Sequence, residues 1–212
     1  IMALVLNGSA NTIGGLAVGG LPDSVVDTDM IATEAVTAPK IGNGGIIQVK
    51  SAVKTGYQSF NNGGNSVFSD ITDLTVTITP TTATNKILID YQISGTGTNN
   101  SYAAVKCVYN VDGGSFDDTV RADALTCTNG NNCTRALSSL DIEDSYGVYK
   151  LKTRGVQFMH SPGSTGTLIY KLQLAQLYDS ANKYTWVNRC TDIANMPRAI
   201  GVSTMTVMEV VA

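Results

Sequence analysis

The sequence has few charged residues and no cluster of basic ones. Lys, Arg, Asp and Glu together make up 15% of its 212 residues, whereas they make up about a quarter of an ordinary soluble domain. The formal net charge is −3, and Lys and Arg are scattered along the chain. Because nucleic-acid binding depends on a concentrated positive surface, we expect neither DNA nor RNA as a partner.

Long apolar runs are also missing. No segment approaches the roughly 20 apolar residues that a helix needs to cross a bilayer, so we expect no membrane insertion. Residues 1–6 are apolar, but they lack the basic start, the length and the cleavage site of a secretory signal peptide. We therefore expect no export by the secretory route.

Histidine and cysteine are scarce. His160 is the only histidine, and the four cysteines are Cys107, Cys127, Cys133 and Cys190. A structural zinc site uses two close pairs of ligands, and only Cys127 and Cys133 form a close pair. We therefore expect no metal and no cofactor. For the Cys127–Cys133 pair, two interpretations stay open: a disulfide that closes a turn, or two free thiols.

Residues that could act in catalysis occur, but not in a pattern typical of an enzyme. Ser161 and Ser164 follow His160 in a Pro/Gly loop without a nucleophile elbow, so we expect His160 at a solvent-facing strand end or in a subunit contact. The acidic residues that could form a glycosidase pair are Asp117, Asp118 and Asp123, and Asp141, Glu143 and Asp144. No repeat of β-helix coils accompanies them. The sequence predicts a protein that is not an enzyme, with a polysaccharide-degrading spike as the third alternative.

The character of the sequence changes near residue 45. The apolar residues of the first segment fit neither a helical nor a strand period, and glycines and Pro22 interrupt them. These apolar positions are Leu16, Val18, Leu21, Val25, Met30, Ile31, Val36 and Ile41. Alone, such a segment cannot bury its side chains, and it is too apolar for a solvated linker. We expect residues 1–45 to form an arm that packs on other copies of the chain or on another protein of a particle.

Residues 46–212 consist of short strand-like segments separated by turns rich in Gly, Asn, Ser and Thr. Alternation is clearest in residues 74–79 and 168–177, where the apolar side chains share one face. The expected strands are residues 46–53, 74–79, 86–93, 102–111, 147–160, 168–177, 184–189 and 201–211. This spacing predicts an all-β fold, an antiparallel β-sandwich or jelly roll, preceded by an extended and mostly irregular arm.

Aromatic residues gather in the last third of the chain. Exposed rings stack on the faces of sugars, and Tyr and Trp often concentrate binding energy. The candidate ligand-binding residues are Tyr146, Tyr149, Tyr178 and Tyr184. The alternative is that such rings fill the sandwich core, which is what we expect for Trp186.

The order of the motifs resembles that of fibre-like proteins of tailed bacteriophages, especially marine and cyanobacterial phages. The arm contributes residues 14–23, 26–32, 35–38 and 40–41, and the sandwich contributes residues 74–80, 85–89, 158–162, 167–172, 186–189 and 203–210. The resemblance implies a virion structural protein, usually a homotrimer, with an arm for assembly or attachment and a sandwich exposed to solvent.

Together these features predict a trimeric fibre or spike, made in the host cytoplasm and located in the virion. Its arm docks on tail, baseplate or capsid proteins, and its sandwich binds a host-surface glycan. The alternative is a capsid decoration or head fibre protein without a ligand. An exposed aromatic patch on the sandwich would favour receptor binding over decoration.

Overall fold

A computed structural model of the chain describes residues 5–7, 12–14, 40–61, 67–97, 101–119, 138–142, 151–176, 184–190 and 200–212. The chain divides into two units, residues 1–40 and residues 41–212. In the first unit, β1 (Val5–Asn7) pairs antiparallel with β2 (Thr12–Gly14). The described part of the chain contains no helix long and apolar enough to cross a membrane.

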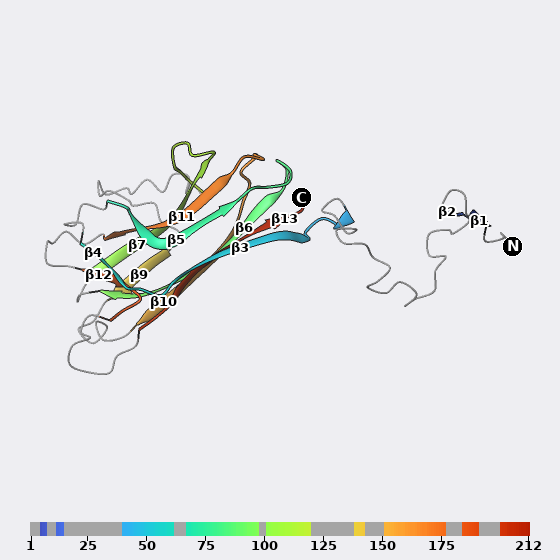
Figure 1. Ribbon diagram of the computed structural model, residues 1–212. Coiled ribbons are helices and arrows are strands. Elements are labelled where there is room, and N and C mark those ends of the chain that lie inside the picture. The colour runs from blue at the N-terminus through green and yellow to red at the C-terminus, as the bar shows by residue number, and fades with distance from the viewer. Residues whose placement is uncertain are drawn as a thin grey trace, which may run out of the picture. The chain divides into compact units, whose positions relative to one another are not determined.

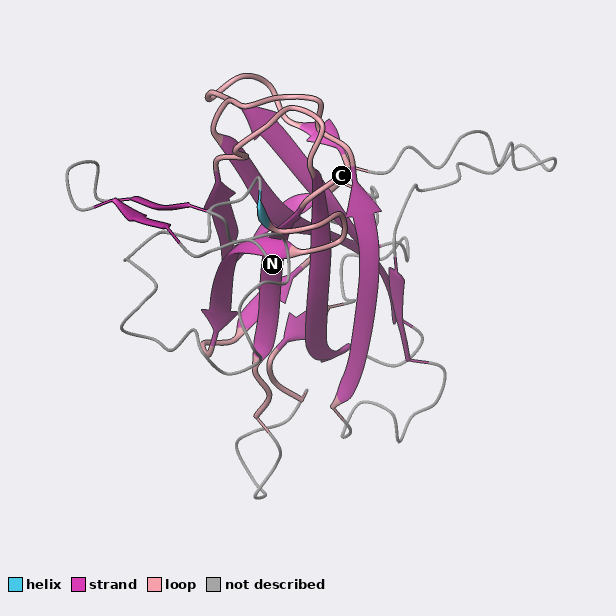
Figure 2. Ribbon diagram, turned by 90° about the vertical axis from the view of Figure 1, so that its right-hand side faces the viewer, coloured by secondary structure: helices cyan, strands magenta, loops and turns pink. Residues whose placement is uncertain are grey.

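The second unit consists of antiparallel strands arranged in two facing sheets (Figures 1 and 2). Its strands are β3 (Ile46–Lys54), β4 (Gln58–Phe60), β5 (Ser69–Ile78), β6 (Lys86–Gly97), β7 (Ser101–Val111), β8 (Asp117–Asp118), β9 (Ser138–Ile142), β10 (Lys152–His160), β11 (Leu168–Gln176), β12 (Thr185–Val187) and β13 (Ser203–Val210). The all-β sandwich expected from the sequence is confirmed.

The first sheet, called sheet I, contains β3, β4, β6, β10, β12 and β13. Strand β6 pairs with β10 along one edge, and with β13 and then β12 along the other. Strand β13 pairs in turn with β3, and β12 pairs with β4. These registers place β12 and β13 end to end in one strand position, and β3 and β4 end to end in the next.

The second sheet, called sheet II, has the order β5–β11–β7, with β8 and β9 both paired with β7. The main strands alternate between the sheets along the chain: β3, β6, β10 and β13 lie in sheet I, and β5, β7 and β11 lie in sheet II. The resulting orders, β3–β13–β6–β10 and β5–β11–β7–β9, are those of a jelly roll.

The core lies between the two sheets and follows from the alternation in the sequence. On β5 and β11 the buried side chains recur at every second position, as in Leu74, Val76 and Ile78 and in Leu168, Tyr170, Leu172 and Leu174. Sheet I contributes Ile87, Ile89, Tyr91 and Ile93 from β6 and Met205 and Val207 from β13. Burial of these apolar side chains is the main term that stabilises the fold.

Candidate functional site

The predicted ligand-binding residues are placed only in part. Tyr146, Tyr149 and Tyr178 lie outside the described residues, whereas Tyr184 lies immediately before β12 and is 39% exposed. Its ring is stacked on that of Trp186, with the centroids 5.7 Å apart and the planes at 14°. Tyr184 therefore belongs to a surface pair of aromatic rings.

Trp186 does not lie in the core, so that expectation was wrong. Its neighbours Thr185 and Val187 are buried, whereas Trp186 is only partly buried. Successive residues of a strand point to opposite faces, so the Trp186 ring lies on the outer face of sheet I. The β12 strand is short and its inward positions are filled by Thr185 and Val187, which leaves the tryptophan on the outside.

Two further side chains complete this surface. The Arg189 guanidinium lies 4.8 Å from the centroid of the Tyr57 ring and 5.6 Å from that of the Trp186 ring. Tyr57 is 59% exposed and lies in the turn between β3 and β4. We call Tyr57, Tyr184, Trp186 and Arg189 the aromatic–arginine surface.

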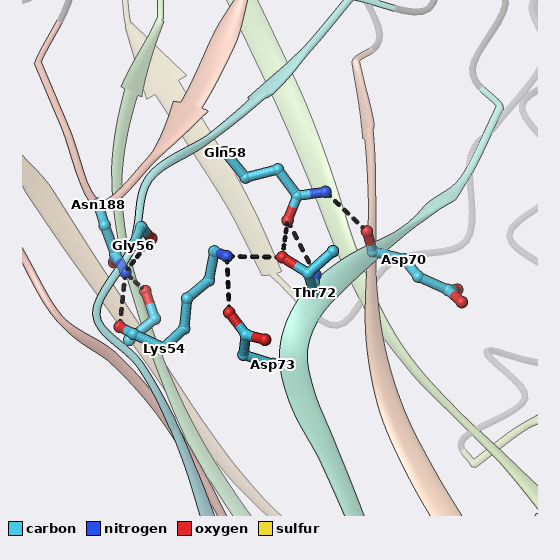
Figure 3. Close-up of polar contacts among 8 residues, drawn as sticks. Lys54, Gly56, Gln58, Asp70, Thr72, Asp73 and Asn188 are labelled. Atoms are coloured by element: carbon cyan, nitrogen blue, oxygen red, sulfur yellow. Dashed lines mark hydrogen bonds and ion pairs between the residues drawn. The ribbon is translucent and has the colours of Figure 1, made fainter.

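Asn188 fixes the backbone beneath this surface. It is fully buried and has a φ of 64°, a left-handed conformation that Asn tolerates better than most residues. Its Nδ2 donates to the carbonyl oxygens of Lys54 at 2.7 Å and Gly56 at 3.1 Å (Figure 3). Its Oδ1 accepts a hydrogen bond of 2.6 Å from the Ser203 hydroxyl. One side chain thus holds the turn that carries Tyr57 to the strand that carries Trp186.

The backbone of Asn188 is held as well. Its N–H donates to the Ser94 carbonyl at 2.7 Å, and its carbonyl accepts from the Gly201 N–H at 3.0 Å. The next residue, Arg189, forms an antiparallel bridge with Ile200. Asn188 therefore lies at the junction between the end of β12 and the start of β13 in sheet I.

A second polar network holds β4 against sheet II (Figure 3). The Gln58 Nε2 donates to the Asp70 carbonyl at 2.9 Å, and its Oε1 accepts from the Thr72 N–H at 2.8 Å. The Lys54 Nζ, which is almost fully buried, donates to the Thr72 hydroxyl at 2.7 Å and lies 3.4 Å from Asp73 Oδ2. The turn with Tyr57 is therefore anchored on both sides.

His160 contradicts the expectation of a solvent-facing or intersubunit histidine. It is 7% exposed, and its Nδ1 lies 2.8 Å from the Tyr170 hydroxyl. The Tyr109 ring packs edge-on against the imidazole at 4.4 Å. Burial lowers the pKa of His160 to about 4. The reason for its position is the strand register: His160 pairs with Ile87 on the core side of β10, where it provides a partner for a buried phenol.

The structure describes only some of the acidic residues considered for glycoside cleavage. Asp118 forms an ion pair of 3.0 Å with Lys106, and Asp117 Oδ1 accepts a hydrogen bond from the Asp118 backbone. Asp141 lies in β9 with only its backbone described, and Asp123, Glu143 and Asp144 lie outside the described residues. Among the described residues, no three His, Cys, Asp or Glu side chains gather as metal ligands would.

The remaining predicted residues concern the arm and the cysteines. Seven of the eight apolar arm residues, and both Cys127 and Cys133, lie outside the described residues. Ile41 is described: it begins the unit 41–212 and is partly buried. The nearby Gly44 N–H donates to the Val211 carbonyl at 2.8 Å, so the segment before β3 is attached to the end of β13.

The aromatic–arginine surface was only partly foreseeable from the sequence. Trp186 and Arg189 are two residues of one motif, 186–189, but Tyr57 follows a glycine in a turn and nothing in its surroundings distinguishes it. The arrangement offers flat apolar ring faces beside a guanidinium with several N–H donors. Such a surface can stack on a sugar ring and donate hydrogen bonds to its oxygens.

Comparisons with known proteins do not place the chain in a family. No family model matches it, and no curated protein matches its sequence. A similar solved structure, described as "CBM4 structure and function", has 11% sequence identity and a TM-score of 0.24, over 70% of this chain and 94% of that chain. A likeness at this TM-score has no bearing on what this chain binds.

Proposed function

We propose that the chain is a structural protein of a tailed-bacteriophage virion, a homotrimeric fibre or spike that binds a host-surface glycan through its sandwich. In this proposal residues 1–45 dock the protein on other virion proteins, and the protein has no catalytic activity. The order of sequence motifs supports the virion role. The aromatic–arginine surface is the observation that supports glycan binding.

The rigidity of the aromatic–arginine surface favours binding. Asn188 holds the backbone on both sides of the surface through buried hydrogen bonds, so Tyr57 and Trp186 are already positioned before a ligand arrives. A pre-positioned site loses less conformational entropy when it binds. Tyr and Trp rings also add large contact areas with few rotatable bonds.

Glycan binding can be tested on the intact chain with a glycan array that includes bacterial surface polysaccharides. We expect the wild-type protein to bind a subset of them, and the Trp186→Ala variant to bind the same glycans about 10- to 30-fold more weakly, as for a central aromatic residue of an interface. Since Trp186 is the only tryptophan, its fluorescence reports on binding directly.

Phe116→Ala is the matched control. Phe116 is 41% exposed, and the Lys171 Nζ of sheet II lies 3.8 Å from its ring centroid, so the control removes an exposed ring away from β12. This variant should keep the wild-type glycan profile. Wild-type protein that binds no glycan, or glycan binding that survives Trp186→Ala, would overturn the ligand part of the proposal.

The virion role is tested by cryo-EM of particles of the phage whose genome encodes this protein. Density for the sandwich at the tail tip or baseplate is the expected result. Density at threefold points of the capsid would instead make the chain a decoration or head fibre protein. A particle without this chain would overturn the virion role altogether.

A further inference from the structure

Four apolar side chains lie side by side across the outer face of sheet I. The registers pair Met208 with Val49 on β3 and with Leu88 on β6, and pair Leu88 with Met159 on β10. Val49 is 55% exposed and Met159 is 46% exposed, and the two central residues are partly buried. We call Val49, Leu88, Met159 and Met208 the apolar row. It crosses every strand position of the sheet.

The residues beside the apolar row are mostly neutral. The next two cross-strand rows toward β12 are Ser51, Thr206, Asp90 and Gln157, and then Val53, Thr204, Gln92 and Gly155. Asp90 is the one charged residue in these two rows. A solvated sheet face normally carries alternating charged and polar side chains. This part of sheet I is therefore poor in the charges that would keep a solvent-facing surface hydrated.

The outer face of sheet II has the opposite character. Lys171 forms an ion pair of 2.7 Å with Asp70, and Lys106 forms one of 3.0 Å with Asp118. Both signs of charge are thus paired across neighbouring strands of sheet II, as expected for a face in water. The two outer faces of one sandwich differ, which indicates that sheet I meets another surface.

The charge pattern favours a second copy of the chain as that surface. A strongly charged partner would select a face of opposite charge, but the rows beside the apolar row contain one charge of each sign: Asp90 on one side and the exposed Lys86, which pairs with Val210, on the other. Three copies around a threefold axis would each turn the same face of near-zero net charge toward the axis, so no large like-charge repulsion opposes their contact. Methionine, which provides two members of the row, adapts its shape readily at such contacts.

The size of the face is adequate for a contact between copies. With strands about 4.8 Å apart and a rise of about 3.4 Å per residue, four strand positions along the length of β13 cover roughly 19 Å by 27 Å. That is roughly 500 Å² before side-chain relief is counted, the same order as the about 800 Å² per partner of a stable interface. Strand β3 is also the edge of the sheet and exposes Ile46, Val49 and Val53, which a neighbouring copy would cover.

We infer that copies of this chain meet through the outer face of sheet I, with the apolar row at the centre of the contact. The inference rests on the homotrimer proposed above and adds the face that forms it. The aromatic–arginine surface stays accessible, because Trp186 pairs with Thr96, eight residues along β6 from Leu88 (96 − 88), which is about 27 Å at the rise of an antiparallel strand.

Analytical ultracentrifugation of the full chain tests the inference. We expect the wild-type protein to sediment as a trimer and the Val49→Glu/Met159→Glu variant to sediment as a monomer at the same concentration. Both positions are exposed within one copy, so the variant should keep the wild-type circular dichroism spectrum. Val67→Glu is the matched control: Val67 is 55% exposed, as Val49 is, but precedes β5 of sheet II. It should remain a trimer.

A second measurement covers the case in which the arm alone holds the trimer together. In Val49→Cys and Val67→Cys variants, maleimide labelling of the native protein should be at least tenfold slower at position 49. Equal labelling rates, or a trimer that survives Val49→Glu/Met159→Glu, would overturn the inference while leaving the trimer and glycan binding intact. A wild-type monomer would overturn the inference and the proposed trimer together. If the cysteine at position 49 stays protected from maleimide after dilution to monomers, the face is covered within one copy of the chain. That result would also overturn the inference.

Discussion

Replacing Asn188 by alanine should destabilise the fold more than most single substitutions. The change removes three hydrogen bonds, which join Asn188 to the carbonyls of Lys54 and Gly56 and to the hydroxyl of Ser203; the bond to Gly56 is partly buried and the other two are buried. At about 1 kcal/mol for each bond, their loss costs about 3 kcal/mol. Alanine at a φ of 64° adds about 1 kcal/mol, because its Cβ disfavours the left-handed region. The free energy of unfolding should therefore fall by about 4 kcal/mol.

Urea unfolding, followed by the fluorescence of Trp186 and by circular dichroism, measures this loss. The two signals should give one midpoint for the wild-type protein, and the slope of free energy against urea should be the same in both proteins. In Asn188→Ala, the fluorescence should also change in the folded state, because the backbone beneath Trp186 has lost its anchor.

Asn188→Gly is the control that separates the two causes. Glycine also removes the hydrogen bonds but adopts positive φ without strain, so it should be about 1 kcal/mol more stable than alanine at this position. A loss of less than 1 kcal/mol in Asn188→Ala would refute the argument that the hydrogen bonds of Asn188 hold this part of the sandwich. Glycine and alanine variants of equal stability would refute the contribution assigned to φ.

Three further predictions follow from buried polar groups. Because burial lowers the pKa of His160 from 6.5 to about 4, unfolding takes up a proton between these values, so stability should fall as the pH drops from 6.5 to 4. His160→Gln should flatten this part of a plot of urea midpoint against pH; an unchanged slope would contradict the assignment. Burial raises the pKa of the Cys107 thiol to about 12, so Cys107 should react with a thiol reagent at pH 8 only after unfolding, as peptide mass spectrometry can show. The fully buried Glu209 accepts hydrogen bonds from the Thr81 N–H at 2.6 Å and the Asn85 amide at 2.7 Å. Glu209→Ala should therefore lower the free energy of unfolding, measured in urea, by about 3 kcal/mol. A loss under 1 kcal/mol would show that water replaces the carboxylate.

Strand alternation made much of the fold predictable. Leu74, Val76 and Ile78 were expected on one face, and all three are buried in the core. The expected strands at 46–53, 86–93, 102–111 and 168–177 correspond closely to β3, β6, β7 and β11. The short strands β4, β8 and β9 were not foreseen, because two to five residues are too few to show a period.

The burial of individual side chains was less predictable. Trp186 was expected in the core and lies on the outer face, and His160 was expected at the surface and is buried. His160 is the last residue of β10, and Trp186 is the middle residue of the three-residue strand β12. At both positions a shift of register by one residue would reverse the face. Sequence composition alone does not give that register.

The sequence by itself determined the fold class of this protein, because alternating apolar residues, turns rich in glycine and asparagine, and few charges are sufficient to indicate a β-sandwich. The tertiary structure decided which residues meet. Tyr57 and Arg189 are far apart in the chain and come together because Asn188 joins the ends of β3 and β12. The apolar row likewise exists only after β3, β13, β6 and β10 have paired in register. Local alternation fixes which side chains share a face of one strand, whereas contacts across strands depend on long-range pairing that no local pattern encodes.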